Sequence, residues 1–114
     1  MVVLMPQSEM REPTFLILLA LTEGAQHGYA LIGQVADLSA GRVHLRAGTL
    51  YGALERLVRE GLVVETGEEV VGGRLRRYYD LSDAGAQALA LEARRLRESA
   101  DAATVRLAAR GVLA

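Results

Sequence analysis

The segment that most restricts the fold of this 114-residue chain is 47–61, which predicts a short amphipathic helix. On a helical wheel, one side gathers four apolar residues: Leu50, Leu54, Leu57 and Val58. The opposite side carries Gly52, Arg56 and Arg59, with Thr49 at its border and Tyr51 at the flank. Gly61 supplies the C-terminal cap. We therefore expect a helix that packs on a core with one face and presents arginines to water with the other.

A two-stranded ribbon is predicted directly after this helix. Residues 62–66 and 75–81 are rich in β-branched, aromatic and leucine side chains, and the glycines between them supply turns: Gly67, Gly72 and Gly73. If the second strand alternates, Arg74 and Arg76 lie on one face and Arg77 on the other. A helix that fits a major groove, with a basic ribbon beside it, is typical of a winged helix-turn-helix.

Two helices are expected before this unit. Pro13 suits a first helical turn, and an apolar run predicts a helix over 14–23 that is buried on more than one side. A second helix is expected over 28–40, with Leu31, Val35 and Leu38 on its buried face. The fold class is thus mainly α with a small β hairpin: a winged helix-turn-helix in residues 1–81, followed by a C-terminal dimerisation helix in 82–114.

That last helix, capped by Ser82 or Asp83 and running to about Arg110, carries a heptad pattern. Six residues form the pattern, which we call the α-helical seam: Leu89, Ala93, Leu96, Ala100, Ala103 and Leu107. The seam either folds back on its own domain or pairs with a second copy, and its length favours the second copy. Phe15, the single phenylalanine, is predicted to lie near a cavity at that dimer interface.

Composition argues against several other classes of function. The absence of cysteine excludes disulfides, thiolate metal sites and thiol nucleophiles, and two isolated histidines make a metal site improbable. Without a phosphate-binding glycine loop or a catalytic triad, we expect no enzyme activity and no cofactor. The net charge is −1, yet residues 42–77 hold seven of the thirteen arginines against five glutamates. With no membrane span and no signal peptide in the sequence, a soluble cytoplasmic protein is expected.

Several short motifs, in this order, resemble the PadR family of transcriptional regulators. The matching segments are Leu-Leu-Ala-Leu-Thr-Glu-Gly at 18–24, His-Gly-Tyr-Ala-Leu at 27–31, Gly-Thr-Leu-Tyr at 48–51, Glu-Gly-Leu at 60–62, Arg-Tyr-Tyr at 77–79 and Leu-Ser-Asp-Ala-Gly at 81–85. The resemblance covers about residues 14–86. Ala47 and Gly52 stand where the family often has proline, and neither change removes a contact group.

The resemblance implies a homodimer, usually a repressor, whose third helices enter successive major grooves of a palindromic operator. It also implies that the wing tips reach the adjacent backbone or minor groove. In this family a small-molecule effector, aromatic or drug-like, often binds near the dimer interface and releases the DNA.

The predicted DNA contacts each have a structural alternative. Arg56 is a candidate for a base edge or a phosphate and Arg59 for a phosphate; the alternative is ion pairs with Glu60 and Glu55. Thr49 and Tyr51 are candidate DNA partners, or else a helix cap and a packing residue. The remaining candidates are Arg74, Arg76, His27 and Tyr29, with His27 equally suited to a structural cap. Arg77 either contacts DNA or packs along the domain.

Three functions are consistent with these residues. The favoured one is a sequence-specific DNA-binding regulator. The main alternative is a winged-helix protein–protein interaction module without DNA binding, and the third is a dimer that acts chiefly as a small-molecule sensor.

Overall fold

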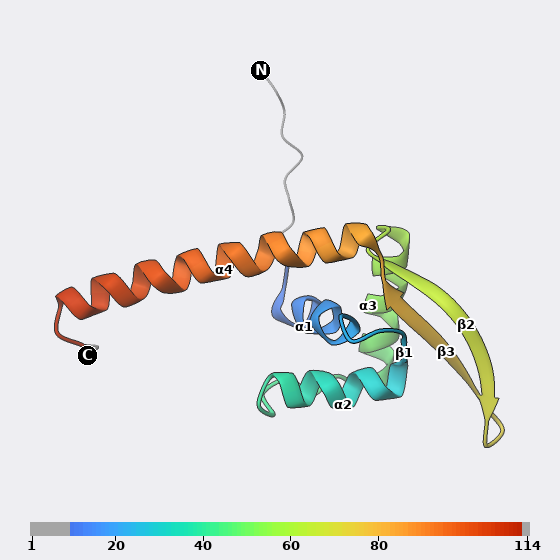
Figure 1. Ribbon diagram of the computed structural model, residues 1–114. Helices are drawn as coiled ribbons and strands as arrows, with labels where there is room; N and C mark the ends of the chain where they lie inside the picture. Colours follow the sequence, from blue (N-terminus) through green and yellow to red (C-terminus); the bar gives the residue numbers. More distant parts are fainter. Residues whose placement is uncertain (1–9, 113–114) are drawn as a thin grey trace.

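The structure, a computed structural model, describes residues 10–112 as four helices and a small antiparallel sheet (Figure 1). The elements run in the order α1 (Glu12–Leu21), β1 (Gln26–His27), α2 (Gly28–Leu38), α3 (Ala47–Arg59), β2 (Val63–Val71), β3 (Arg74–Leu81) and α4 (Asp83–Ala109). This arrangement confirms the predicted fold class. Of the helices described, none is both long and apolar enough to pass through a bilayer.

The sheet has the strand order β1-β3-β2 and is dominated by the β2–β3 hairpin. The hairpin is longer than expected, because β2 continues past a register shift between Glu65 and Gly67. Gly67 therefore lies within the strand, and the prediction that it belongs to the turn is wrong. The turn is Gly72 and Gly73 alone, whose φ values of 57° and 78° suit a two-residue hairpin loop.

Strand β1 was not predicted. It consists of Gln26 and His27, which pair with Tyr79 and Tyr78 of β3. The Gln26 side chain donates a hydrogen bond to the carbonyl oxygen of Ala20 over 2.7 Å. These contacts join the loop after α1 to the root of the hairpin.

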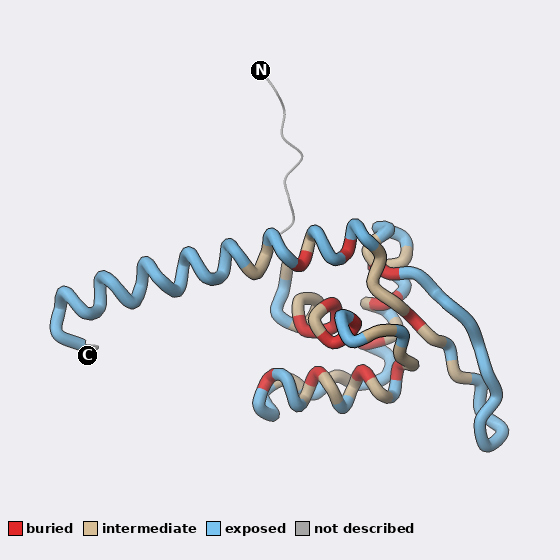
Figure 2. The backbone as a smooth tube through the Cα atoms, viewed as in Figure 1, coloured by how far each residue is buried: buried red, intermediate tan, exposed pale blue. Residues whose placement is uncertain are grey.

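The core is centred on α1, as Figure 2 makes plain, and residues of α2, α3, the hairpin and α4 close around it. Its buried residues are Leu16, Ile17, Leu18, Ala20 and Leu21, which confirms that this helix is buried on several sides. From α2 and α3 the core receives Leu31, Val35, Leu50, Leu54 and Leu57. Leu38 was expected in this set, but it is 48% exposed at the last residue of α2.

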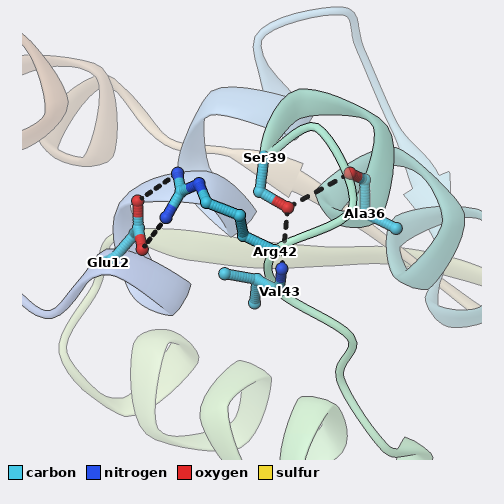
Figure 3. Close-up of polar contacts among 5 residues, drawn as sticks. All are labelled: Glu12, Ala36, Ser39, Arg42 and Val43. Carbon is cyan, nitrogen blue, oxygen red and sulfur yellow. Dashed lines mark hydrogen bonds and ion pairs between the residues drawn. The ribbon is translucent and has the colours of Figure 1, made fainter.

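Helix α2 ends two residues earlier than predicted because the chain turns sharply after it. Ala40 and Gly41 both have positive φ, 54° and 81°, and the Gly41 amide donates to the Ala36 carbonyl. Ser39 is buried, and its hydroxyl donates to the carbonyl oxygen of Ala36 and accepts from the Val43 amide (Figure 3). The turn therefore fixes the direction in which the chain approaches α3.

Arg42 ties the same turn to the start of α1. Its guanidinium donates to both carboxylate oxygens of Glu12, at 3.0 and 2.8 Å (Figure 3). The hydrogen bond from Arg42 lowers the pKa of Glu12, and Glu12 in turn raises the pKa of Arg42. The pair is exposed, so we assign it a role in orientation more than in stability.

Helix α4 begins as predicted, with the Ser82 hydroxyl accepting from the Gly85 amide. Gly85 is buried so tightly that a Cβ there would lie 2.0 Å from the Leu62 carbonyl oxygen. Leu89, the first residue of the predicted seam, is buried in the core of its own chain, and Ala93 is half-buried. From Arg94 to Val112 every residue is exposed, and α4 extends well beyond the body (Figures 1 and 2). The alternative in which this helix folds back on its own domain is therefore wrong for its distal half.

Candidate nucleic-acid interface

The outer face of α3 is formed as the sequence predicted. Leu50, Leu54 and Leu57 have no exposed surface and anchor the helix to the core. Four residues of the opposite side are exposed: Thr49, Gly52, Arg56 and Arg59. A Cβ built on Gly52 would meet nothing within 4 Å, so open space lies beside this part of the helix. The face can therefore approach a large ligand closely.

Arg56 is held by α1. Its Nη2 donates to Thr14 Oγ1 over 2.9 Å, at the rim of a groove of about 210 Å³ between α1 and α3. Glu60 also lines this groove, yet no Arg56–Glu60 ion pair forms in the described part of the chain. The expected Glu55–Arg59 pair is likewise absent from residues 10–112. Among the residues described, Arg56 and Arg59 thus have no carboxylate within ion-pair distance.

Arg59 lies on the side of α3 that faces the hairpin. A second groove of about 250 Å³ opens there, lined by Glu55, Val58, Arg59, Glu65, Arg77 and Tyr79. Within it, Arg77 Nε lies 3.9 Å from a carboxylate oxygen of Glu65 and 3.6 Å from one of Glu68. Arg77 is therefore partly neutralised by its neighbours, and its side chain remains about half exposed.

Helix α3 starts where the sequence predicted, but its N-cap is not the residue considered for that role. The helix begins at Ala47, its N-cap is Arg46, and no side chain caps its first amides. Thr49 is the third helical residue, so the alternative in which it is the N-cap is wrong. Arg46 is exposed beside these free amides, which adds a cation to the face that the sequence reasoning missed. Its only signal was its place immediately before the helix.

The N-terminus of α2 lies beside α3. The His27 Nδ1 accepts a hydrogen bond from the Ala30 amide over 3.3 Å, so the structural-cap alternative holds for this residue. The Tyr51 ring lies directly over Gly28, where a Cβ would come within 2.4 Å of the tyrosine oxygen. Tyr51 therefore packs, as its structural alternative had it, and remains half-buried. Tyr29 points outward and is 50% exposed.

The hairpin carries its arginines on the faces that alternation predicted. Tyr79 is buried on the side shared with Arg77, whereas Arg76 and Tyr78 lie on the other side. The Tyr78 hydroxyl donates to Glu69 Oε1 over 2.5 Å, and this bond raises the pKa of Tyr78. The His27 and Tyr78 rings meet edge to face at 5.6 Å. Arg74, beside the turn, is exposed, and Arg76 is half-buried.

No cluster of three or more His, Asp or Glu side chains suited to a metal ion occurs within 10–112. The exposed polar groups of α3 and the hairpin include arginine donors on both elements and lie beside two open grooves. Such a surface suits recognition of another macromolecule.

Comparison with protein families identifies the family to which the chain belongs. Residues 17–91 match the model of the transcriptional regulator PadR-like family, which is well over half of the chain. The chain belongs to this family. No curated protein matches this PadR-like chain.

Solved structures with the same fold include other PadR proteins. A PadR family regulator from Clostridium difficile R20291 is 24% identical, covers 85% of this chain and 99% of its own, and superposes with a TM-score of 0.71. One from Eggerthella lenta is 26% identical, with 84% of each chain covered and a TM-score of 0.67. Bacillus subtilis PadR in complex with operator DNA is 24% identical over 69% of this chain and 46% of its own, with a TM-score of 0.61.

Proposed function

We propose that this PadR-like chain is a cytoplasmic, sequence-specific DNA-binding regulator that acts as a homodimer, with α3 as the reading helix. The observation that carries the proposal is the exposure of Arg56 and Arg59 on a helix whose other face buries three leucines completely. Two guanidinium groups on a rigid platform suit phosphate oxygens and guanine edges. Membership of a transcriptional regulator family and the operator complex of the Bacillus subtilis relative support it.

The hairpin is the second contact in this proposal. Arg74 at the tip and Arg76 on the outer face reach the phosphate backbone or the minor groove beside the segment that α3 reads. Tyr29 and the capping residue His27 contribute at the N-terminus of α2, where backbone amides and the helix dipole attract a phosphate. Thr49, Tyr51 and Gly52 complete the interface along α3.

The dimer is formed by the distal half of α4. Leu96 and Leu107 are 42% and 37% exposed within one chain, and Ala100 and Ala103 lie between them on the same side. A seam of this period buries its apolar residues only against another helix. Two copies joined in this way place two reading helices on a palindromic site, which a single copy lacks.

We propose further that the dimer represses transcription and releases DNA when a small apolar effector binds. A groove of about 330 Å³ runs between α1 and α4, and its apolar lining includes Met10, Phe15, Leu16, Leu19, Leu38 and Leu96. Leu96 belongs to the seam, so the partner's helix would close the groove in a dimer. Phe15 offers the aromatic surface that an aromatic ligand stacks on.

The test is selection of DNA by the purified protein from a random duplex library, followed by mobility-shift titration of the enriched duplex at several salt concentrations. We expect a palindromic consensus and an affinity that falls steeply as salt rises, because phosphate contacts release counterions. Enrichment of no consensus, together with binding that ignores salt, would reject the proposal.

The protein–protein module remains the second candidate because of the hairpin. Val70 and Leu75, which pair across the strands, are 71% and 52% exposed, and Arg77 beside them is engaged by glutamates. An apolar pair flanked by neutralised charge resembles a protein contact more than a DNA contact. If the unaltered protein dimerises but enriches no DNA sequence from the library, this candidate is favoured.

A further inference from the structure

The hydrogen bond between Arg56 and Thr14 joins two elements that lie far apart in the sequence. Arg56 belongs to the last turns of α3, and Thr14 is the third residue of α1, 42 positions earlier. Thr14 is half-buried and its β-branched side chain has few rotamers, so its hydroxyl is a fixed acceptor. The guanidinium of Arg56, by contrast, ends a long side chain with much rotamer freedom to lose.

The chemistry of this acceptor sets Arg56 apart from other arginines of the chain. Arg42, Arg77 and Arg95 all have a carboxylate within 4.0 Å, which compensates their charge. Arg56 is bonded to a neutral hydroxyl instead, although the carboxylate of Glu60 is available at the same groove. A neutral acceptor restricts the side chain and leaves its positive charge in place for an anionic ligand.

Helix α1, which carries Thr14, also contacts other parts of the molecule. Helix α1 packs against α4 and lines the groove that contains Leu96. Two residues before Thr14, the Glu12 carboxylate binds Arg42, which precedes α3. The start of α1 therefore contacts both the segment before α3, through Arg42, and the last turns of α3, through Arg56. A shift of α1 relative to α3 would move the hydroxyl that accepts from Arg56.

We propose that Thr14 is a positioning residue for DNA recognition: its hydroxyl orders the guanidinium of Arg56, whose positive charge stays available for a phosphate or a base. This inference rests on the proposed function, since it needs Arg56 to contact DNA. Through Thr14, the arginine of the reading face is coupled to the helix that supports the seam.

The experiment compares Thr14→Val with Thr14→Ser on the duplex enriched from the random library. Thr14→Val keeps the shape and removes the acceptor, so we expect affinity to fall about fivefold, the effect of one hydrogen bond. Thr14→Ser keeps the hydroxyl and should bind within about twofold of the unaltered protein. In an Arg56→Ala background, Thr14→Val should have no further effect, because the two changes remove one interaction.

A measurement on the free protein separates this inference from the proposed function. The side-chain Nε–H of Arg56, followed by nitrogen relaxation, should be ordered in the unaltered protein and in Thr14→Ser, and mobile in Thr14→Val. Equal mobility in all three, or an equal loss of affinity in the Arg56→Ala background, would overturn the role of Thr14. If the library yields no duplex at all, the proposed function fails and this inference fails with it.

Discussion

Two exposed regions of this molecule contrast in chemistry: the outer face of α3 with the hairpin, and the distal half of α4. The first presents arginines, a threonine and a glycine from a helix whose other side is buried in the core. The second presents leucine, valine and alanine on a helix with no core beside it. Exposed charge on a rigid platform calls for an anionic partner, whereas an exposed apolar seam calls for another helix. The two regions therefore predict separable defects.

The largest effect is expected from breaking the seam. The double variant Leu96→Glu, Leu107→Glu places four like charges in a paired interface and should leave the protein monomeric in sedimentation velocity. Operator affinity should then fall by about 100-fold or more, because the second half-site is no longer bound intramolecularly.

The matched control changes one leucine and one valine on the side of α4 opposite the seam. Leu91 and Val105 are 64% and 68% exposed, so Leu91→Glu, Val105→Glu adds the same charge away from the seam. This variant should remain a dimer. A dimer that survives the seam variant, or dissociates in the control, would assign self-association to another surface.

The next largest effect is expected at the contact between the start of α4 and the turn after α3. Gly85→Ala would force a Cβ to within 2.0 Å of the Leu62 carbonyl oxygen, so α4 must shift relative to the turn after α3. We expect the free energy of unfolding to fall by about 2–3 kcal/mol in urea titration. Gly33→Ala, in α2 with open space around it, should instead add about 0.5–1 kcal/mol. Equal effects at both glycines would mean that Gly85 is not the tight contact described.

A smaller effect is expected in the groove between α3 and the hairpin. Glu65→Gln, Glu68→Gln would release Arg77, and affinity for duplex DNA should rise about threefold, with a steeper salt dependence. The control Glu23→Gln, Asp37→Asn removes the same charge at the far end of α1 and α2. Equal gains in both variants would show an effect of net charge alone.

The smallest effect is expected at Glu12. Arg42 lowers the Glu12 pKa, so the ion pair stabilises the fold fully above the ordinary glutamate pKa. That contribution disappears as the pH falls through the lowered value. Thermal unfolding of Glu12→Gln should therefore differ slightly from the unaltered protein at pH 7 and converge with it in acid. A difference that grows in acid would contradict this assignment.

The apolar and polar faces of α3 and α4 could be predicted from the sequence, because helical periodicity depends only on residues close together in the chain. The buried leucines of α3, the cap at Ser82 and the seam of α4 follow from residues within a few turns of each other. Strand β1 was not predictable, because two residues carry no periodic pattern and Gln26 and His27 join the sheet only through contacts with β3. The hairpin was underestimated because Gly67, Glu68 and Glu69 disfavour a strand. They are accommodated by cross-strand pairing with Tyr78, Arg77 and Arg76.

Side-chain partners distant in the sequence were the hardest part of the site to foresee. The expected partners of Arg56 and Arg59 were glutamates on the same helix, since spacing alone suggests them. Thr14 is reached only once α1 and α3 are packed together. Leu38 has the spacing of a core residue, yet α2 ends beside open groove before the core can cover it.

The central claim is that α3 and the hairpin bind DNA through their arginines, and the double variant of the exposed Arg56 and the half-buried Arg76, Arg56→Ala, Arg76→Ala, tests it most directly. The measurement is the slope of operator affinity against salt, with Arg94→Ala, Arg97→Ala on α4 as the matched control of charge. The account predicts a folded dimer that has lost its operator, with residual binding whose slope is smaller by about two contacts, while the control keeps both. Unchanged affinity and slope in the Arg56, Arg76 variant would contradict it.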